Sequence, residues 1–276
     1  MELKHNTRQG GKMDISSVLF LVVGLGSIFI AFLMDGGTGG ALLAGTAALI
    51  VFGGTISAVG VSFPIGQLKR IPGIVKSFFK PKKIDLVALV DFFKDVSYKT
   101  RKNGLLSLES EITDENEIDP FIKKGLQLVV DGVDPQAVRS ILELELETTA
   151  ERHSRGAAIF ETAGGYAPTM GIIGTVMGLV HVLNNLTDPS VLGPKIASAF
   201  LATLYGISSA NLLWLPMSAR LKALDIDEFN EKRLIIEGIL FIQEGVNPNT
   251  IAEKLKGFLN KNEIIKFDQL GSKEEA

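Results

Sequence analysis

The stretch 158–182 constrains the fold of this chain most, because residues 162–180 carry no charge. At about 1.5 Å per residue, a helix of this length crosses a hydrocarbon core of roughly 30 Å. The stretch is also poor in bulky side chains, and Pro168 interrupts it. Such a helix would be weak in water, whereas in a membrane small residues let the backbones of neighbouring helices approach closely. The sequence therefore predicts a transmembrane helix that packs against another helix through a smooth face.

Three further apolar stretches carry no charge and are long enough to span a membrane. These stretches are 15–34, 41–63 and 196–219. Together with 158–183 they predict an all-α membrane protein with four transmembrane helices. The glycines expected to lie in helix–helix contacts are Gly171, Gly174 and Gly178 in the third span and Gly206 in the fourth.

The distribution of Lys and Arg predicts the orientation of the spans. The two short loops, 35–40 and 184–195, contain a single basic residue, Lys195, whereas the other flanking segments are rich in Lys and Arg. Under the positive-inside rule both termini are therefore expected in the cytoplasm, and the two short loops on the outer side. The predicted cytoplasmic parts are the tail 1–14, the segment 64–157 and the region 220–276. Either Met1 or Met13 could be the natural start.

The predicted cytoplasmic parts have helical patterns. The expected helices are 85–101, 115–130, 220–244 and 249–258. Asp134 followed by Pro135 has the pattern of an N-cap and a first helical residue, and the helix that starts there is expected to continue into the third span. The remainder, 261–276, is expected to be a frayed polar tail.

The sequence contains no enzyme motif. It has no cysteine, and its three histidines are too scattered for a metal cluster. The glycines of the third span lack the Lys-Ser/Thr of a phosphate-binding loop and stand in an apolar run, so helix packing explains them better. A net charge of −3 gives no sign of nucleic-acid binding. We therefore expect no catalytic residue, metal, cofactor or nucleic-acid partner.

The spans also lack charged groups. No Asp, Glu, Lys or Arg lies in their apolar cores, although ion relays in membranes usually need such a residue. A carboxylate for ion conduction would have to come from another chain. The spans offer hydroxyl groups instead, from Thr175 in the third and Thr203 in the fourth. Each hydroxyl could bond a carbonyl of its own helix one turn back, or the two could form a shared polar site between faces of small residues.

The whole pattern resembles the A subunit of the bacterial flagellar motor stator, the MotA/PomA family. The resemblance rests on the four spans, the long insertion between the second and third, the run APTMGIIGTVMGL at 167–179 and the run ATLYG at 202–206. It extends from Met13 to about Leu259. It implies a multi-pass protein of the bacterial inner membrane that acts as a motor component and not as an enzyme.

The resemblance also implies partners. In that family several A subunits, thought to be five, surround two copies of a B subunit. Each B subunit has one span with a critical aspartate and a periplasmic domain that grips peptidoglycan. Ion flow to that aspartate drives rotation of the A ring, whose cytoplasmic face turns the switch complex of the rotor.

Roles for particular residues follow from the resemblance. Arg101 and Glu109 match the loop charges that engage the rotor, with Lys102 as a helper. Pro168 and Pro216 match the prolines that couple ion passage to movement.

Three further positions match the ion path of that family. Thr175 and Thr203 match residues near the path, and Ala202 stands where sodium-driven members tend to have a threonine. Protons are therefore the expected ion. Sodium remains the alternative, because sodium-driven members also carry a residue like Thr175.

Two other functions are considered. An energiser of outer-membrane transport of the ExbB/TolQ type would resemble the last two spans, but such proteins usually have three spans, which the first hairpin, 15–63, argues against. A membrane transporter or scaffold that moves no rotor would be expected to show repeats among its spans or a polar site of its own. The sequence shows neither feature.

Overall fold

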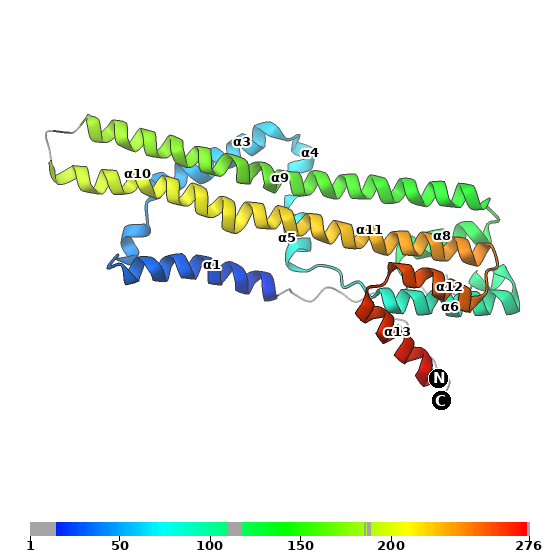
Figure 1. Ribbon diagram of the computed structural model, residues 1–276. Coiled ribbons are helices and arrows are strands. Elements are labelled where there is room, and N and C mark those ends of the chain that lie inside the picture. Colours follow the sequence, from blue (N-terminus) through cyan, green and yellow to red (C-terminus); the bar gives the residue numbers. More distant parts are fainter. Residues whose placement is uncertain (1–14, 110–117, 185, 187–188, 275–276) are drawn as a thin grey trace. The chain divides into compact units, whose positions relative to one another are not determined.

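The computed structural model describes residues 15–109, 118–184, 186 and 189–274 (Figure 1), and over these ranges the chain forms helices joined by turns. Four of the helices are long and apolar enough to cross a membrane. The predicted all-α fold with four transmembrane helices is therefore confirmed. The described residues fall into two compact units. We call 15–81 with 152–223 the transmembrane unit, and 82–151 with 224–274 the extramembrane unit.

The transmembrane unit begins with a helical hairpin. Its first helix is α1 (Ile15–Met34), and a turn with Gly36 at φ 84° follows it. The second span is built from η1 (Gly39–Leu42), α2 (Gly45–Ala48), the π-helical η2 (Leu49–Gly53) and α3 (Gly54–Ser62). It ends where Phe63 adopts an extended conformation before Pro64, because a proline disfavours helical geometry in the residue that precedes it. Two short helices, α4 (Ile65–Leu68) and α5 (Ile71–Phe79), follow.

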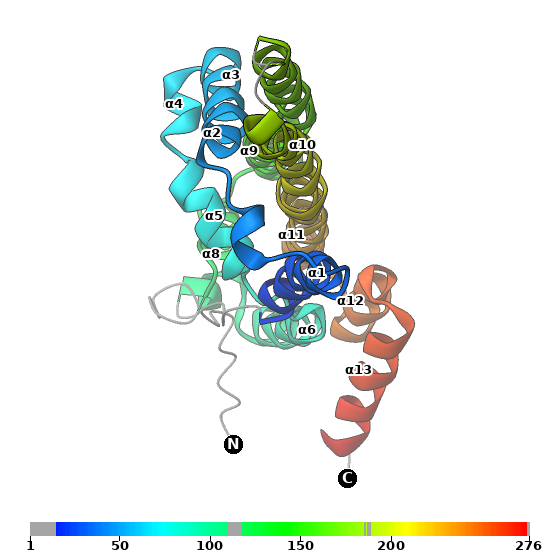
Figure 2. The ribbon, with the colours of Figure 1, turned by 90° about the vertical axis from the view of Figure 1, so that its left-hand side faces the viewer.

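The remaining spans lie in three long elements. Helix α9 (Pro135–Leu183) contains the third apolar stretch, and its residues belong to both units. The fourth stretch runs through α10 (Pro189–Ser209), the π-helical η4 (Ala210–Trp214) and the start of α11 (Leu215–Gln243). Helix α2 packs against α10, as Figure 2 shows.

The loop expected over 184–195 is shorter than predicted, because α10 already begins at Pro189. The prolines in this stretch suggested a loop. At the first position of a helix, however, a proline has a suitable φ and no N–H to lose.

The extramembrane unit has a hydrophobic core shared by all its longer helices. Its elements are α6 (Leu86–Asn103), η3 (Leu105–Ser107), α8 (Pro120–Val130), the outer parts of α9 and α11, α12 (Pro248–Leu255), η5 (Lys256–Phe258) and α13 (Lys261–Glu274). Helix α12 lies along α6 (Figure 1). Large side chains from five helices are fully buried in this core, among them Phe93, Leu126, Leu142, Ile239 and Ile251.

Two expectations for this unit were wrong. The helix expected from residue 115 begins at Pro120, because Asp119 caps it by accepting a hydrogen bond from the Phe121 backbone nitrogen at 2.8 Å. Residues 115–117 lie outside the described part. The tail expected to fray forms α13 instead, and Phe267 on that helix is buried in the core.

Candidate functional site

Helices α9 and α10 make backbone contact through glycine. A Cβ added at Gly206 would lie 2.6 Å from the Ala167 carbonyl oxygen, and one at Gly171 would lie 2.8 Å from the Ala202 carbonyl oxygen. Real Cβ atoms do not approach other atoms so closely, and a backbone carbonyl cannot swing aside as a side chain can. Glycine at these two positions therefore sets the distance between the helices.

The same contact continues along α9. A Cβ at Gly174 would lie 2.6 Å from the Ala202 Cβ, and one at Gly178 would lie 2.5 Å from the Ala199 Cβ. The structure thus places all four glycines singled out in the sequence at one helix–helix contact.

The two threonines of the sequence analysis meet at this contact. The Thr175 and Thr203 hydroxyl groups are hydrogen-bonded to each other. The Thr175 hydroxyl oxygen also lies 2.9 Å from the Ala199 carbonyl oxygen and 3.1 Å from the Gly171 carbonyl oxygen. A hydroxyl group has one proton to donate, so Thr175 can donate to only one of these acceptors at a time. The cluster therefore combines both arrangements considered from sequence, a bond to its own helix and a bond across the contact.

Ala202, next to Thr203 in the sequence, lies in apolar surroundings. It is 1% exposed, and it packs with Ala47 and Val51 of the second span in a small apolar cluster. A larger polar side chain at position 202 would enter this cluster.

The two prolines disturb different helices. Pro168 lies inside α9, where it supplies no N–H for the Gly164 carbonyl, and its Cα would be 3.2 Å from a Cβ at Gly206. Pro216 follows η4 by two residues and lies at the start of α11. Isolated π-helical segments often mark functional places in helices. Pro168 therefore lies where the third and fourth spans approach each other closely, and Pro216 lies beside the π-helical part of the fourth span.

A tyrosine joins the second and fourth spans. The Tyr205 hydroxyl group donates to the Leu42 carbonyl and accepts a hydrogen bond from the Ala44 backbone nitrogen at 3.0 Å. These two backbone groups belong to the irregular start of the second span, where the helix leaves them without partners of its own. Sequence reasoning missed this role, although Tyr205 lies in the quoted ATLYG run.

The charges expected at the rotor lie at one end of α6. Arg101 and Lys102 are exposed in its last turn, and Glu109 is exposed just after η3. Gly104, at φ 82°, turns the chain between them. Leu108, which is fully buried, anchors this turn in the core. The charges thus project from a firmly held part of the chain.

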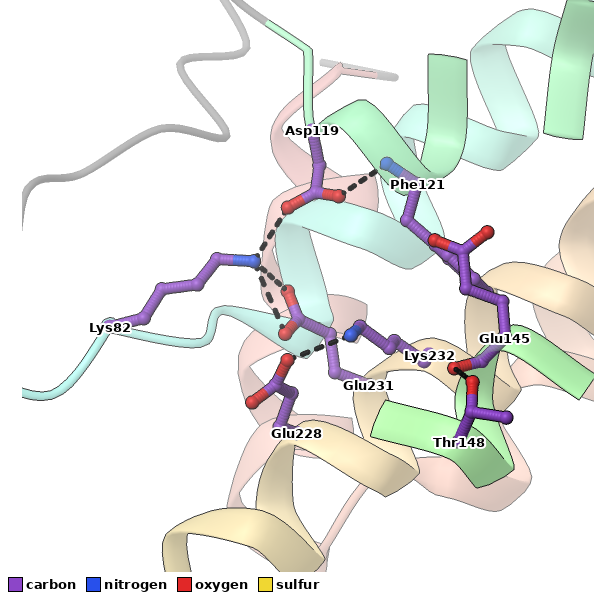
Figure 3. Close-up of polar contacts among 8 residues, drawn as sticks. All are labelled: Lys82, Asp119, Phe121, Glu145, Thr148, Glu228, Glu231 and Lys232. Carbon is purple, nitrogen blue, oxygen red and sulfur yellow. Dashed lines mark hydrogen bonds and ion pairs between the residues drawn. The ribbon is translucent and has the colours of Figure 1, made fainter. Parts of the chain in front are cut away.

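An ion cluster lies within the extramembrane unit (Figure 3). The Lys82 ammonium nitrogen lies 2.8 Å from an Asp119 carboxylate oxygen and 3.1 Å from a Glu231 carboxylate oxygen, and Glu231 is 5% exposed. Burial alone would raise the pKa of Asp119, but the hydrogen bond and charge of Lys82 outweigh burial and lower it. Burial alone would lower the pKa of Lys82, and the two carboxylates raise it instead. This cluster joins the segment between α5 and α6 to α8 and α11.

Comparison with known proteins decides the family. A model of the MotA/TolQ/ExbB proton channel family matches residues 113–233. Motility protein A of Bacillus subtilis is 36% identical over 94% of this chain and 96% of its own length. The chain belongs to the MotA/TolQ/ExbB proton channel family. It is therefore a multi-pass membrane protein, and the predicted family resemblance is confirmed.

Two further members are similar over nearly the whole chain. Chemotaxis protein PomA of Vibrio alginolyticus is 38% identical over 90% of this chain and 96% of its own length. A solved structure of the flagellar MotAB stator complex from Bacillus subtilis has a TM-score of 0.85 at 36% identity, covering 91% of this chain and 99% of that chain. The similarity thus includes the first hairpin, 15–62, as well as the segment matched by the model of the MotA/TolQ/ExbB family.

The π-helical segments η2 and η4 were also missed from sequence. A π turn adds one residue to a helix without changing its composition, so it leaves no periodic pattern to detect. Only Pro216, close after η4, gave a local sign of disturbance.

Proposed function

We propose that this chain is the A subunit of an ion-driven flagellar stator. The observation that carries the proposal is the match to motility protein A over 94% of the chain, at 36% identity. A flagellar stator complex that contains such a chain has the same fold at a TM-score of 0.85. The function is transport of an ion across the membrane coupled to rotation of the flagellar rotor.

The composition of the spans supports a partner that supplies the titrating group. The apolar cores of the four spans contain no Asp, Glu, Lys or Arg. Proton relays in membranes usually depend on an ionisable side chain, so we expect another chain to supply one. We propose a single-span B subunit that supplies a membrane aspartate and a peptidoglycan anchor.

The threonine pair is proposed to line the path of the ion. Thr175 and Thr203 bring two hydroxyl oxygens to one point of the α9–α10 contact, next to the Ala199 carbonyl. Such oxygens can hydrogen-bond water or a protonated carboxyl group of a partner helix. The Ala202 side chain has no oxygen and lies in an apolar cluster, so we propose protons as the ion, with sodium as the alternative.

The exposed charges at the end of α6 are proposed to contact the rotor. Charged groups that are exposed and held on a firm scaffold can steer a partner and fix its register. Arg101, Lys102 and Glu109 meet these conditions, and the switch complex of the rotor is the proposed partner. The wider assembly is proposed to be five A chains around two B chains. We propose that the protein lies in a bacterial inner membrane with both termini in the cytoplasm, a topology that the distribution of Lys and Arg supports.

Deletion of the gene tests this function. Cells that lack it should build filaments of normal number, counted by electron microscopy, yet fail to swim. The parent gene should restore swimming, whereas a gene with Arg101→Glu and Glu109→Lys should not. The matched control reverses two exposed charges elsewhere, Glu147→Lys and Lys261→Glu, and should restore swimming.

The outcomes separate the candidate functions. Restored swimming by the Arg101→Glu/Glu109→Lys gene would remove the rotor-contact assignment. Normal swimming of the deletion strain, together with loss of an energised uptake process at the outer membrane, would favour the ExbB/TolQ type of function instead.

A further inference from the structure

The segment between the second span and α6 has an unusual charge. The chain as a whole has 28 basic and 31 acidic residues, yet residues 63–84 contain basic side chains and no acidic ones. The basic residues are Lys69, Arg70, Lys76, Lys80, Lys82 and Lys83. Such a segment attracts anions, because its positive charges are not balanced by acidic side chains of the same segment.

Five of these six cations have no partner among the described residues. Lys82 belongs to the ion cluster of Asp119 and Glu231. The other five are exposed, and none of their side chains forms a hydrogen bond or ion pair with any residue that the structure describes. Elsewhere in the described chain, several lysines are paired with carboxylates, such as Lys124 with Glu145 and Lys222 with Glu161. The unpaired cations are therefore available to an external anion.

The position of α5 puts the four cations of the transmembrane unit, Lys69, Arg70, Lys76 and Lys80, at a membrane surface. Phe78 of α5 is buried against Phe160 and Met217. Phe160 lies at the beginning of the third apolar stretch, 158–183, and Met217 lies near the end of the fourth, 196–219. Helix α5 thus packs at the level where these two spans end, on the side where the second span also ends.

The residues around these cations are better suited to contact lipid than to contact a water-soluble protein. The apolar side of α5 is already covered by the chain's own residues, so it offers no groove for a partner helix. Large apolar side chains stand exposed just before the cations, with Val61 91% and Ile65 69% exposed. Cations beside exposed apolar side chains match the boundary between headgroups and acyl chains of a phospholipid.

We propose that Lys69, Arg70, Lys76 and Lys80 form a binding surface for anionic phospholipid headgroups. The surface lies in the leaflet where the second span ends, and it fixes α4 and α5 at that boundary. This interaction is independent of the proposed function, since it needs neither a B subunit nor a rotor.

The chain provides its own reporter for a test. Its single tryptophan, Trp214, packs in the same apolar clusters as α5 and is partly exposed. Bromine atoms on lipid acyl chains quench tryptophan fluorescence only at short range. Full-length protein is reconstituted in vesicles that mix phosphatidylcholine with brominated phosphatidylglycerol, or with brominated phosphatidylcholine as reference. A Trp214→Phe variant gives the background signal.

The parent protein should bind phosphatidylglycerol near Trp214 about tenfold more tightly than phosphatidylcholine at low salt. This preference should disappear in about 1 M salt, where the screening length falls to about 3 Å. The variant Lys69→Gln/Arg70→Gln/Lys76→Gln/Lys80→Gln should show no preference. A matched variant with the same loss of charge should keep it. That control is Lys94→Gln/Lys123→Gln/Arg233→Gln/Lys261→Gln, four basic residues of the extramembrane unit without described partners.

Three results would overturn the proposal. Both brominated lipids could quench the Trp214 fluorescence of the parent protein equally, or the preference for phosphatidylglycerol could be insensitive to salt. The control variant could lose the preference as fully as the surface variant, which would assign the effect to total charge. The salt series uses only the parent protein, so it decides the question even if the surface variant does not fold. Release of a co-purified acidic protein by the surface variant, without any lipid preference of the parent, would assign the surface to that protein.

Discussion

Lys82→Met is the most informative single change in the extramembrane unit. The substitution removes the cation between Asp119 and Glu231, and Glu231 is 5% exposed. Loss of one partner from a buried ion pair typically costs about 3–5 kcal/mol, because the other charge stays buried without compensation. The Lys82 side chain is 41% exposed, and Asp119 keeps its hydrogen bond from Phe121. We therefore expect a smaller loss, about 2–3 kcal/mol.

Hydrogen–deuterium exchange of the full-length protein measures this loss locally. Asp119 caps α8 and Glu231 lies in α11, so the amides of these two helices should report the opening of the cluster. A tenfold change corresponds to 1.4 kcal/mol, and the expected acceleration is therefore about 30- to 140-fold. The control is Lys83→Met, which removes the neighbouring exposed lysine that has no described partner.

Equal exchange in Lys82→Met and Lys83→Met would refute this reasoning. A second comparison tests the cause. The double variant Lys82→Met/Glu231→Gln removes the buried charge together with its partner, so it should recover part of the lost protection. If the double variant exchanges as fast as Lys82→Met, the lysine acts by packing and not by charge.

Three further predictions follow from described contacts. Burial alone would raise the pKa of Asp119, but the hydrogen bond and charge of Lys82 lower it. A lowered pKa means that the ionised Asp119 stabilises the fold at neutral pH, and this stabilisation is lost as the pH falls through the lowered pKa. Asp119→Asn should therefore accelerate exchange of α8 at pH 7 but progressively less below about pH 3.9, the ordinary pKa of Asp; an equal effect at every pH would contradict this. Gly206→Ala should lower thermal stability in detergent by about 1–3 kcal/mol, whereas Gly165→Ala, whose added Cβ meets nothing within 4 Å, should not; equal melting of the two variants would disprove the close contact. Tyr205→Phe should leave two backbone groups of the second span unpaired and accelerate exchange at Ala44, at a cost of about 1–3 kcal/mol; unchanged exchange there would show that the bond is dispensable.

Much of the fold was predictable because the membrane imposes strong rules on sequence. An uncharged stretch of sufficient length has few alternatives to a transmembrane helix, so the four spans could be identified from composition alone. Capping patterns were similarly direct. Asp134 with Pro135 marked the start of α9, and Asn247 with Pro248 stands at the start of α12, where the Asn247 side chain accepts from the Asn249 backbone nitrogen.

Contacts between distant residues could not be predicted in this way. Lys82 and Glu231 are 149 positions apart, and no local pattern links them. The threonine pair is another contact that sequence could predict only in part. Sequence singled out Thr175 and Thr203 but left two arrangements open, since the choice depends on how closely α9 approaches α10. That distance is set by backbone contacts at Gly171 and Gly206.

The glycine contact between α9 and α10 has a consequence for genetics. Glycine is the smallest residue, so every substitution at these positions pushes the two helices apart and none can bring them closer. Where the opposing atom belongs to a side chain, a second mutation can restore the space. The exchange Gly174→Ala with Ala202→Gly should be tolerated, because the next atom beyond the Ala202 Cβ lies at an ordinary 3.5 Å. Where the opposing atom is a backbone carbonyl, as at Gly206 facing Ala167, no substitution can remove it. Suppressors of damage at Gly174 should therefore arise directly opposite, whereas suppressors of damage at Gly206 should have to lie elsewhere in the molecule.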